Sequence, residues 1–85
     1  MIKAFSSKAW QEYLDWQRED KNMLKRIHLL IKDIERQPYE GIGKPEALKH
    51  HLSGWWSRRI NDEHRLVYTI DHQTLRVVAL KYHYS

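Results

Sequence analysis

The residues best suited to chemistry lie in the second half of the chain, and most of them are charged. Cleavage of RNA without a metal ion needs a base for the 2′-OH proton, cations around the phosphate and an acid for the 5′-oxygen. A carboxylate, arginines and a histidine suit these roles, and aromatic rings can stack on unpaired bases. The residues of these types are Lys44, Glu46, Lys49, Arg58, Arg59, Arg65, Lys81, His83 and Tyr84. Because any basic domain contains such residues, their types alone favour a plainer interpretation, a charged and solvated face.

Other kinds of site have little support in the sequence. There is no cysteine, and none of the six histidines has a partner at helical spacing together with a carboxylate. The segment Gly41-Ile42-Gly43-Lys44 lacks the downstream Gly-Lys-Ser/Thr of a phosphate-binding loop. We therefore expect neither a metal ion nor a cofactor.

Length and charge narrow the class of protein. With 85 residues the chain should be a single domain, residues 1–85, near the lower limit for a self-sufficient core. Its formal net charge of +4 favours a polyanion as partner. No run approaches the roughly 20 apolar residues of a membrane span, and no basic segment followed by an apolar run opens the chain. Together with the lack of cysteine, these features lead us to expect a cytoplasmic protein with no membrane partner.

Two helices should follow a short strand at residues 2–5. Ser6 or Ser7 can cap the first helix and Asp20 the second, because their side chains accept free backbone N–H groups. Pro38 should end the second helix. Helical spacing relates Trp10, Tyr13, Leu14 and Gln17 in the first helix, and Met23, Ile27, Leu30, Ile31 and Ile34 in the second, with Lys32 and Asp33 on the solvent side.

After the second helix the pattern becomes extended. Gly41, Gly43 and Pro45 indicate a loop, and residues 45–51 are expected to form a short helical turn. Beyond Gly54, side chains alternate with a period of two through three segments, which is typical of an antiparallel meander. The predicted architecture is β-α-α-β-β-β, an α+β fold with two N-terminal helices packed on one face of a small antiparallel sheet.

We expect function on the sheet face opposite the helices, which should carry Arg59 and Arg65. Arg58 and Arg59 are neighbours on one strand and point to opposite faces, so both cannot line one site. Structural roles stay open for two candidates. Glu46 could neutralise the first turn of the short helix, and Arg65 could pair with Glu63 across a turn.

Several stretches of unusual composition cover much of the chain. They are PYEGIGKPEALKH at residues 38–50, LSGWWSRRI at 52–60, EHRLVY at 63–68 and the ending KYHY at 81–84. These stretches, with the N-terminal pattern Trp10, Tyr13-Leu14, Trp16-Gln17 and Asp20-Lys21, resemble the YoeB family, a branch of the RelE/ParE superfamily of toxins from bacterial toxin–antitoxin pairs. Two positions depart from the family. Ser85 follows the tyrosine at which the family typically ends, and Trp55 stands where a smaller aromatic is usual.

The resemblance implies a fold, an activity and partners. The implied fold is that of the RelE-like microbial ribonucleases. The implied activity is that of an mRNA interferase, an endoribonuclease that cuts messenger RNA in the ribosomal A site without a metal ion and so inhibits translation. The implied partners are mRNA, the ribosome with its rRNA, a second copy of the chain, and a YefM-like antitoxin whose acidic C-terminal segment binds across the active face.

The resemblance also assigns catalytic roles, position by position. It places the general base at Glu46, the transition-state arginine at Arg65, the general acid at His83 and the terminal catalytic tyrosine at Tyr84. The implied reaction is attack of a 2′-OH on its own phosphate, which gives a 2′,3′-cyclic phosphate and a free 5′-OH. This assignment requires Arg65 and His83 to lie on the same open face, with Tyr84 turned round beyond the last ladder bond.

Four cationic residues complete the predicted site. Lys49 and Arg59 match family positions that help to hold RNA phosphate. Lys44 and Arg58 add positive charge that would help to hold ribosomal RNA, with salt-sensitive affinity.

Two other functions remain open. One is a toxin of the same fold that only binds and blocks its target, as ParE-like members do to gyrase, and the other is an inactive RNA-binding regulator. A toxin that only binds would not need the set Glu46, Arg65, His83 and Tyr84, so the presence of this set argues against it.

Overall fold

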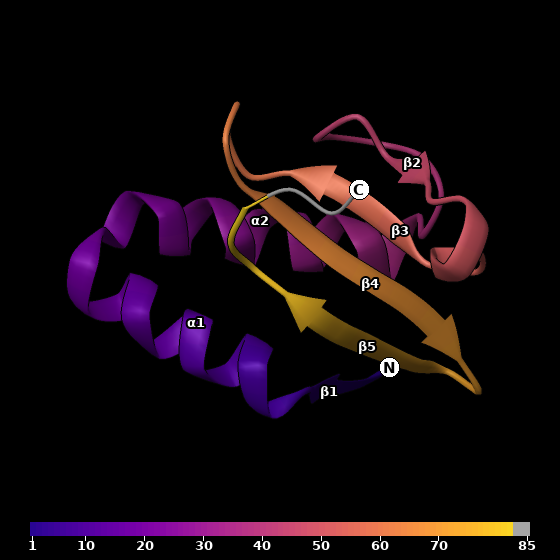
Figure 1. Cartoon of the computed structure of the whole chain (residues 1–85), viewed down its shortest axis with the longest axis horizontal. Helices are drawn as coiled ribbons and strands as arrows, with labels where there is room; N and C mark the ends of the chain where they lie inside the picture. The colour runs from indigo at the N-terminus through magenta and orange to yellow at the C-terminus, as the bar shows by residue number, and fades with distance from the viewer. Residues whose placement is uncertain (83–85) are drawn as a thin grey trace.

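The computed structural model describes residues 1–82, which form two helices and a five-stranded sheet (Figure 1). In chain order the elements are β1 (Ile2–Phe5), α1 (Ser7–Glu19), α2 (Lys21–Arg36), β2 (Glu46–Ala47), the short 3-10 helix η1 (His50–Leu52), β3 (Trp56–Arg59), β4 (Arg65–Asp71) and β5 (Thr74–Ala79). The order confirms the α+β class and the predicted β-α-α-β-β-β succession, to which β2 and η1 are additions. None of the helices over residues 1–82 is long and apolar enough to cross a membrane.

Both long helices are capped as the sequence predicts. Ser6 Oγ accepts a hydrogen bond from the N–H of Ala9 (3.0 Å), and the Asp20 carboxylate accepts one from the N–H of Asn22 (3.0 Å). Asp20 also marks the end of α1, since its own N–H is donated to the carbonyl of Trp16. These bonds satisfy terminal N–H groups that have no partner within a helix, so they fix where each helix begins.

The centre of the core comes from α2. Ile27, Leu30 and Ile34 are fully buried, as their helical spacing predicts. They pack with residues from the helix-facing side of β4 and β5, namely Leu66, Tyr68, Leu75 and Val77. Burying one large apolar side chain contributes about 1.5–3 kcal/mol, so this stripe holds α2 against the sheet.

The orientation of α1 is set by polar contacts. Trp10 and Leu14, which helical spacing relates, are both exposed and do not belong to the core. The buried residues of this helix are Ala9, Glu12 and Trp16. Glu12 Oε1 accepts the N–H of Leu80 (2.7 Å), and Trp16 Nε1 donates to the Leu80 carbonyl (2.9 Å). The partner of both side chains is the chain just after β5, which no pattern within α1 can reveal.

The five strands form one mixed sheet in the order β1-β5-β4-β3-β2. The strands β3, β4 and β5 pair antiparallel in succession, which confirms the predicted meander. The sheet was predicted to be antiparallel throughout, and this is wrong for one pair, because β1 pairs parallel with β5. A parallel pair needs a long connection between its strands. The connection from β1 to β5 begins with α1 and α2. The two long helices lie together on one side of the sheet, so neither of them covers its other face (Figure 1).

The predicted helical turn at residues 45–51 is wrong. Glu46 and Ala47 instead pair with Ser57 and Trp56 and form the edge strand β2. The helix η1 begins only after this strand. Because the pairing partner of β2 lies in a later segment, local residue preferences did not reveal the strand.

Candidate functional site

The register of β2, β3 and β4 brings Glu46, Arg59 and Arg65 to one face of the sheet. Glu46 is paired with Ser57, and Arg59 is paired with Arg65. Ser57 and Arg59 are two residues apart on β3 and therefore share a face. A strand spacing of about 4.8 Å and a rise of about 3.3 Å per residue put the Cα atoms of Glu46 and Arg65 roughly 12 Å apart. Two long side chains can close that distance around a phosphodiester.

Arg65 is half-buried, and the turn before β4 holds part of its guanidinium. Nη1 donates to the carbonyls of Asn61 (2.8 Å), Asp62 (3.2 Å) and His64 (3.1 Å). Within residues 1–82, Nε and Nη2 have no hydrogen-bond partner, and no pair with Glu63 forms. The turn therefore fixes one corner of the guanidinium and leaves the rest of it available to an anion.

Glu46, Lys44 and Lys49 are exposed around the edge strand β2. As a strand residue, Glu46 cannot neutralise a helix terminus, which excludes that alternative role. None of the three has an ion-pair partner in the described part of the chain, where no three His, Asp or Glu side chains are grouped to hold a metal ion. This edge of the sheet thus presents one unpaired carboxylate and two unpaired cations.

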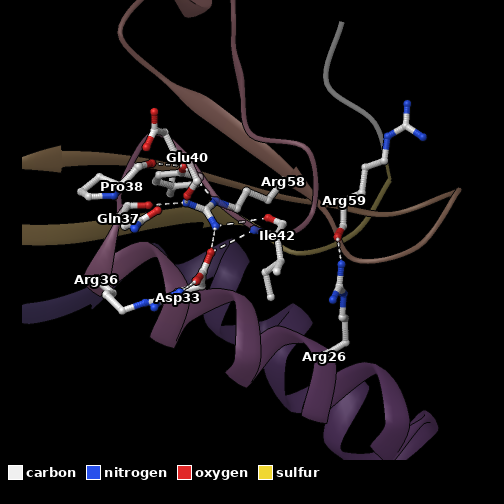
Figure 2. Close-up of polar contacts among 10 residues, drawn as sticks. Arg26, Asp33, Arg36, Gln37, Pro38, Glu40, Ile42, Arg58 and Arg59 are labelled. Atoms are coloured by element: carbon white, nitrogen blue, oxygen red, sulfur yellow. Dashed lines mark hydrogen bonds and ion pairs between the residues drawn. The ribbon is translucent and has the colours of Figure 1, made fainter.

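Arg59 is exposed, and its side chain extends away from α2 (Figure 2). Its N–H donates to the carbonyl of Gly43 (2.7 Å), which ties the loop before β2 to β3. Beside it lies a groove of about 330 Å³ lined by Arg26, Gly43, Lys44, Arg59, Ile60, Asn61 and Asp62. Arg26 is a cation that the sequence analysis missed, because α2 carries several exposed basic residues and nothing in the sequence distinguishes this one.

Arg58 was predicted to help hold RNA, and the structure contradicts this, because its side chain is fully buried. The alternation along β3 turns it toward the helices, opposite to Arg59. Nη1 donates to Asp33 Oδ2 (2.6 Å) and the Ile42 carbonyl (3.2 Å), Nη2 to the Gln37 (2.5 Å) and Glu40 (2.7 Å) carbonyls, and Nε to the Tyr68 hydroxyl (3.3 Å). With both terminal nitrogens occupied and no exposed surface, Arg58 cannot contact a phosphate.

Asp33, the acidic partner of Arg58, was expected on the solvent side of α2 but is only 8% exposed. Hydrogen bonds from Arg36, from the N–H of Ile42 and from Arg58 lower the pKa of the Asp33 carboxyl from 3.8 to about 2. The sequence contained a signal, since Asp33 is three residues after the buried Leu30 and so lies on the same face of the helix. We refer to these two residues as the Arg58–Asp33 pair.

The Arg58–Asp33 pair organises the loop that leads into β2. It binds the backbone of Gln37, Glu40 and Ile42, all within residues 37–44. Gly41, at φ 120°, packs so closely on the pair that an added Cβ would clash with the Asp33 carboxylate. The loop therefore closes around a buried ion pair, and its path determines where β2 begins.

The chain end is held as far as Tyr82. The Tyr82 N–H donates to His64 Nδ1 (2.8 Å), and its carbonyl accepts the N–H of Arg65 (3.1 Å). His83 and Tyr84 lie outside the described residues, so their place beside Arg65 remains a prediction.

Comparison with known proteins places the chain in a family. The model for YoeB-like toxins of bacterial type II toxin–antitoxin systems matches residues 5–84. Toxin YoeB of Synechocystis sp. is 58% identical over 82 residues, which cover 96% of this chain and 95% of that protein. Toxin YoeB of Escherichia coli strain K12 is 55% identical over 80 residues, which cover 94% of this chain and 95% of that protein.

Solved structures agree with the sequence comparison. A YoeB/ParE toxin from Agrobacterium tumefaciens superposes with a TM-score of 0.97 at 42% identity, over 99% of this chain and 100% of that one. YoeB from Staphylococcus aureus, solved as a dimer, gives a TM-score of 0.93 at 49% identity, over 99% and 98% of the two chains. A chain of the RelBE2 complex of Mycobacterium tuberculosis, at 21% identity and a TM-score of 0.70, shares the fold alone and supports the RelE-like prediction. The chain therefore belongs to the YoeB-like toxins of bacterial type II toxin–antitoxin systems.

Proposed function

We propose that this toxin is an mRNA interferase, a ribosome-dependent endoribonuclease that cuts messenger RNA in the A site and so inhibits translation. The observation that supports this most strongly is the common face of Glu46, Arg59 and Arg65. A carboxylate able to act as a base lies there near two guanidiniums able to stabilise an anion. The hydrogen bond between Tyr82 and Arg65 adds support, since the segment with the proposed acid starts at that point.

In the proposed reaction Glu46 accepts the proton of the ribose 2′-OH, and the oxygen attacks the adjacent phosphorus. Arg65 stabilises the additional negative charge on the phosphate oxygens. His83 donates a proton to the departing 5′-oxygen, and Tyr84 contacts the reacting phosphate beside it. The bond from phosphorus to the 5′-oxygen breaks, which leaves a 2′,3′-cyclic phosphate and a free 5′-OH. This scheme uses neither a metal ion nor a cofactor.

The exposed cations serve to hold RNA in this proposal. Within residues 1–82, Lys44, Lys49 and Arg59 have no ion-pair partner. Lys44 and Lys49 lie on either side of the proposed base along the chain, and Arg59 shares its face of the sheet, so these cations can bind phosphates of the message and of rRNA. Arg58 is removed from the predicted set because it is buried. Exposed side chains on a flat face position flexible RNA poorly by themselves. We therefore infer that the ribosome supplies the rest of the positioning.

We propose two protein partners by analogy with solved relatives. YoeB of Staphylococcus aureus forms a dimer and, in another structure, a heterotetrameric complex with YefM. This chain should likewise form a homodimer and bind a YefM-like antitoxin whose acidic C-terminal segment covers the cationic face. Action on translating ribosomes implies that the toxin works in the cytoplasm.

The test is cleavage of a defined message on purified ribosomes, followed by primer extension. We expect cuts in the A-site codon, and a decrease of about 10²–10⁴-fold in the single-turnover rate for Glu46→Ala and for His83→Ala. Glu40→Gln is the matched control, because Glu40 is exposed on the neighbouring loop and only its carbonyl is bound by Arg58. Undiminished cutting by both site variants would remove the proposed proton-transfer roles.

The chemistry is tested by changing the message. A 2′-deoxy nucleotide on the 5′ side of the scissile bond should abolish cleavage, because it removes the attacking hydroxyl. Cleavage of the deoxy message with a 5′-phosphate product would refute attack by the 2′-OH. Loss of gyrase supercoiling without new message ends would instead support a toxin that only binds its target.

A further inference from the structure

His64 lies at the junction of the turn before β4 and the chain end, and its imidazole is largely buried. Its ring packs edge-on against Trp16 of α1, with centroids 4.9 Å apart, and lies 5.2 Å from the ring of Tyr82. The backbone N–H of His64 donates to Asn61 Oδ1 (2.7 Å), which holds the turn in place. The contact with Trp16 and the bond to Asn61 therefore position the imidazole independently of Tyr82.

The contact with Tyr82 identifies one nitrogen of the His64 imidazole as a hydrogen-bond acceptor. A backbone N–H can only donate, so Nδ1, which lies 2.8 Å from the Tyr82 nitrogen, must be the unprotonated acceptor. With Nδ1 as the acceptor, the other ring nitrogen, Nε2, lies 3.4 Å from Glu63 Oε1. His64 thus offers Tyr82 a hydrogen-bond acceptor at a defined position.

Tyr82 is held from both sides in an unfavourable conformation. Its φ of 62° is in the left-handed region, which side chains with a Cβ rarely adopt. His64 accepts its N–H, and the N–H of Arg65 is donated to its carbonyl. Without the imidazole acceptor only one of these two bonds would oppose relaxation toward negative φ. The direction in which the chain leaves Tyr82 therefore depends on His64.

We propose that His64 is a positioning residue for catalysis. By binding Tyr82 it fixes, next to Arg65, the point from which the chain continues to His83 and Tyr84. This inference rests on the proposed function, since it matters for the reaction only if His83 is the general acid. A proton donor must lie within hydrogen-bond distance of the leaving oxygen, and a displacement of about 1 Å can lower a rate about 10²-fold. His64 acts through Tyr82 and does not touch the RNA.

Three substitutions separate this role from simple packing. His64→Asn places its amide oxygen close to the position of Nδ1 and keeps the acceptor, while it loses the ring contact with Trp16. His64→Leu keeps apolar contact and loses the acceptor. His64→Gln stays polar, but its longer side chain places the amide beyond the Nδ1 position, so it replaces the leucine variant should that one fail to fold.

The measurements are single-turnover cleavage on ribosomes, ribosome affinity, thermal unfolding and hydrogen exchange of the Tyr82 amide. We expect His64→Leu or His64→Gln to cleave ten- to a hundredfold more slowly than wild type with unchanged affinity, and its Tyr82 amide to exchange faster. His64→Asn should lose less than threefold in rate although it is the less stable of the Asn and Leu variants. Rates that follow thermal stability, or wild-type cleavage by His64→Leu, would overturn the proposal.

A parallel experiment distinguishes failure of this inference from failure of the proposed function. His83→Ala is assayed on the same message. If His83→Ala is inactive and His64→Leu is unimpaired, only the positioning role of His64 is wrong. If His83→Ala cleaves normally, the proposed general acid is wrong and the positioning role for catalysis is overturned with it.

Discussion

Replacing Arg58 by methionine should lower the free energy of unfolding by about 3–5 kcal/mol, the usual result of removing one member of a buried ion pair. The substitution leaves the Asp33 carboxylate, which is 8% exposed, without its guanidinium partner. It also leaves the carbonyls of Gln37, Glu40 and Ile42 without the donor that Arg58 supplies. Methionine fills much of the arginine volume, so the loss reports mainly on the polar contacts.

This loss is a large part of the total free energy of unfolding expected for the chain. For 85 residues, at roughly 0.05–0.15 kcal/mol per residue, the free energy of unfolding is of the order of 4–13 kcal/mol. At roughly 4–8 °C per kcal/mol for a domain of this size, the midpoint temperature should fall by about 12–40 °C. The variant should therefore be marginally folded at 37 °C even if wild type is of average stability.

The assay is urea unfolding at neutral pH, followed by tryptophan fluorescence and by circular dichroism. Arg59→Met is the matched control, because it makes the same substitution one residue along at an exposed side chain, and it should change the free energy by less than about 0.5 kcal/mol. The double variant Asp33→Leu/Arg58→Met should recover part of the loss, since it removes the uncompensated charge. A loss below about 1 kcal/mol in Arg58→Met, or equal losses in Arg58→Met and Arg59→Met, would refute the view that the Arg58–Asp33 pair anchors the loop.

Three further predictions concern the same loop and face. Because the pKa of Asp33 is about 2 in the folded chain against an ordinary 3.8, the unfolded state binds more protons between these values, so stability should fall as the pH is lowered from about 5 to 2. Asp33→Asn should make stability depend less on pH over this range in acid unfolding experiments. An unchanged dependence would show that Asp33 is not its cause. Gly41→Ala should destabilise the fold by more than about 1 kcal/mol in urea unfolding, whereas Gly54→Ala, with no atom within 4 Å of the added Cβ, should suffer backbone strain alone; equal losses would contradict the clash with Asp33. Arg59→Ala should reduce the slope of log affinity for RNA against log salt by about 0.7, and an unaltered slope would argue that Arg59 binds no phosphate.

The sequence predicted those features that depend on neighbouring residues. The caps at Ser6 and Asp20 and the buried stripe of Ile27, Leu30 and Ile34 follow from local hydrogen bonding and helical spacing. The meander of β3, β4 and β5 follows from the period of two after Gly54. The resemblance to the YoeB family supplied the identities of Glu46, Arg59 and Arg65, and strand register then supported their common face.

Burial of charged side chains was not predicted from the sequence, although the helical spacing of Asp33 from Leu30 contained a signal for it. Asp33 and Glu12 were read as solvent-facing or left unassigned, because a carboxylate is normally exposed unless a partner compensates it. Their partners, Arg58 and the backbone of Leu80, are 25 and 68 residues away along the chain. Periodicity describes which side of an element is apolar, and it contains no information on such distant partners.

By itself the sequence determined the family, the order of helices and strands, and the types of residue available for chemistry. Tertiary structure alone decided that Arg58 is an internal anchor while Arg59 faces out, that residues 46–47 form a strand, and that His64 contacts Tyr82. The physical reason is that the free energy of a polar group depends on what surrounds it after folding. Two adjacent arginines on one strand can thus serve opposite purposes, one satisfied by carbonyls inside the protein and one left free to bind phosphate.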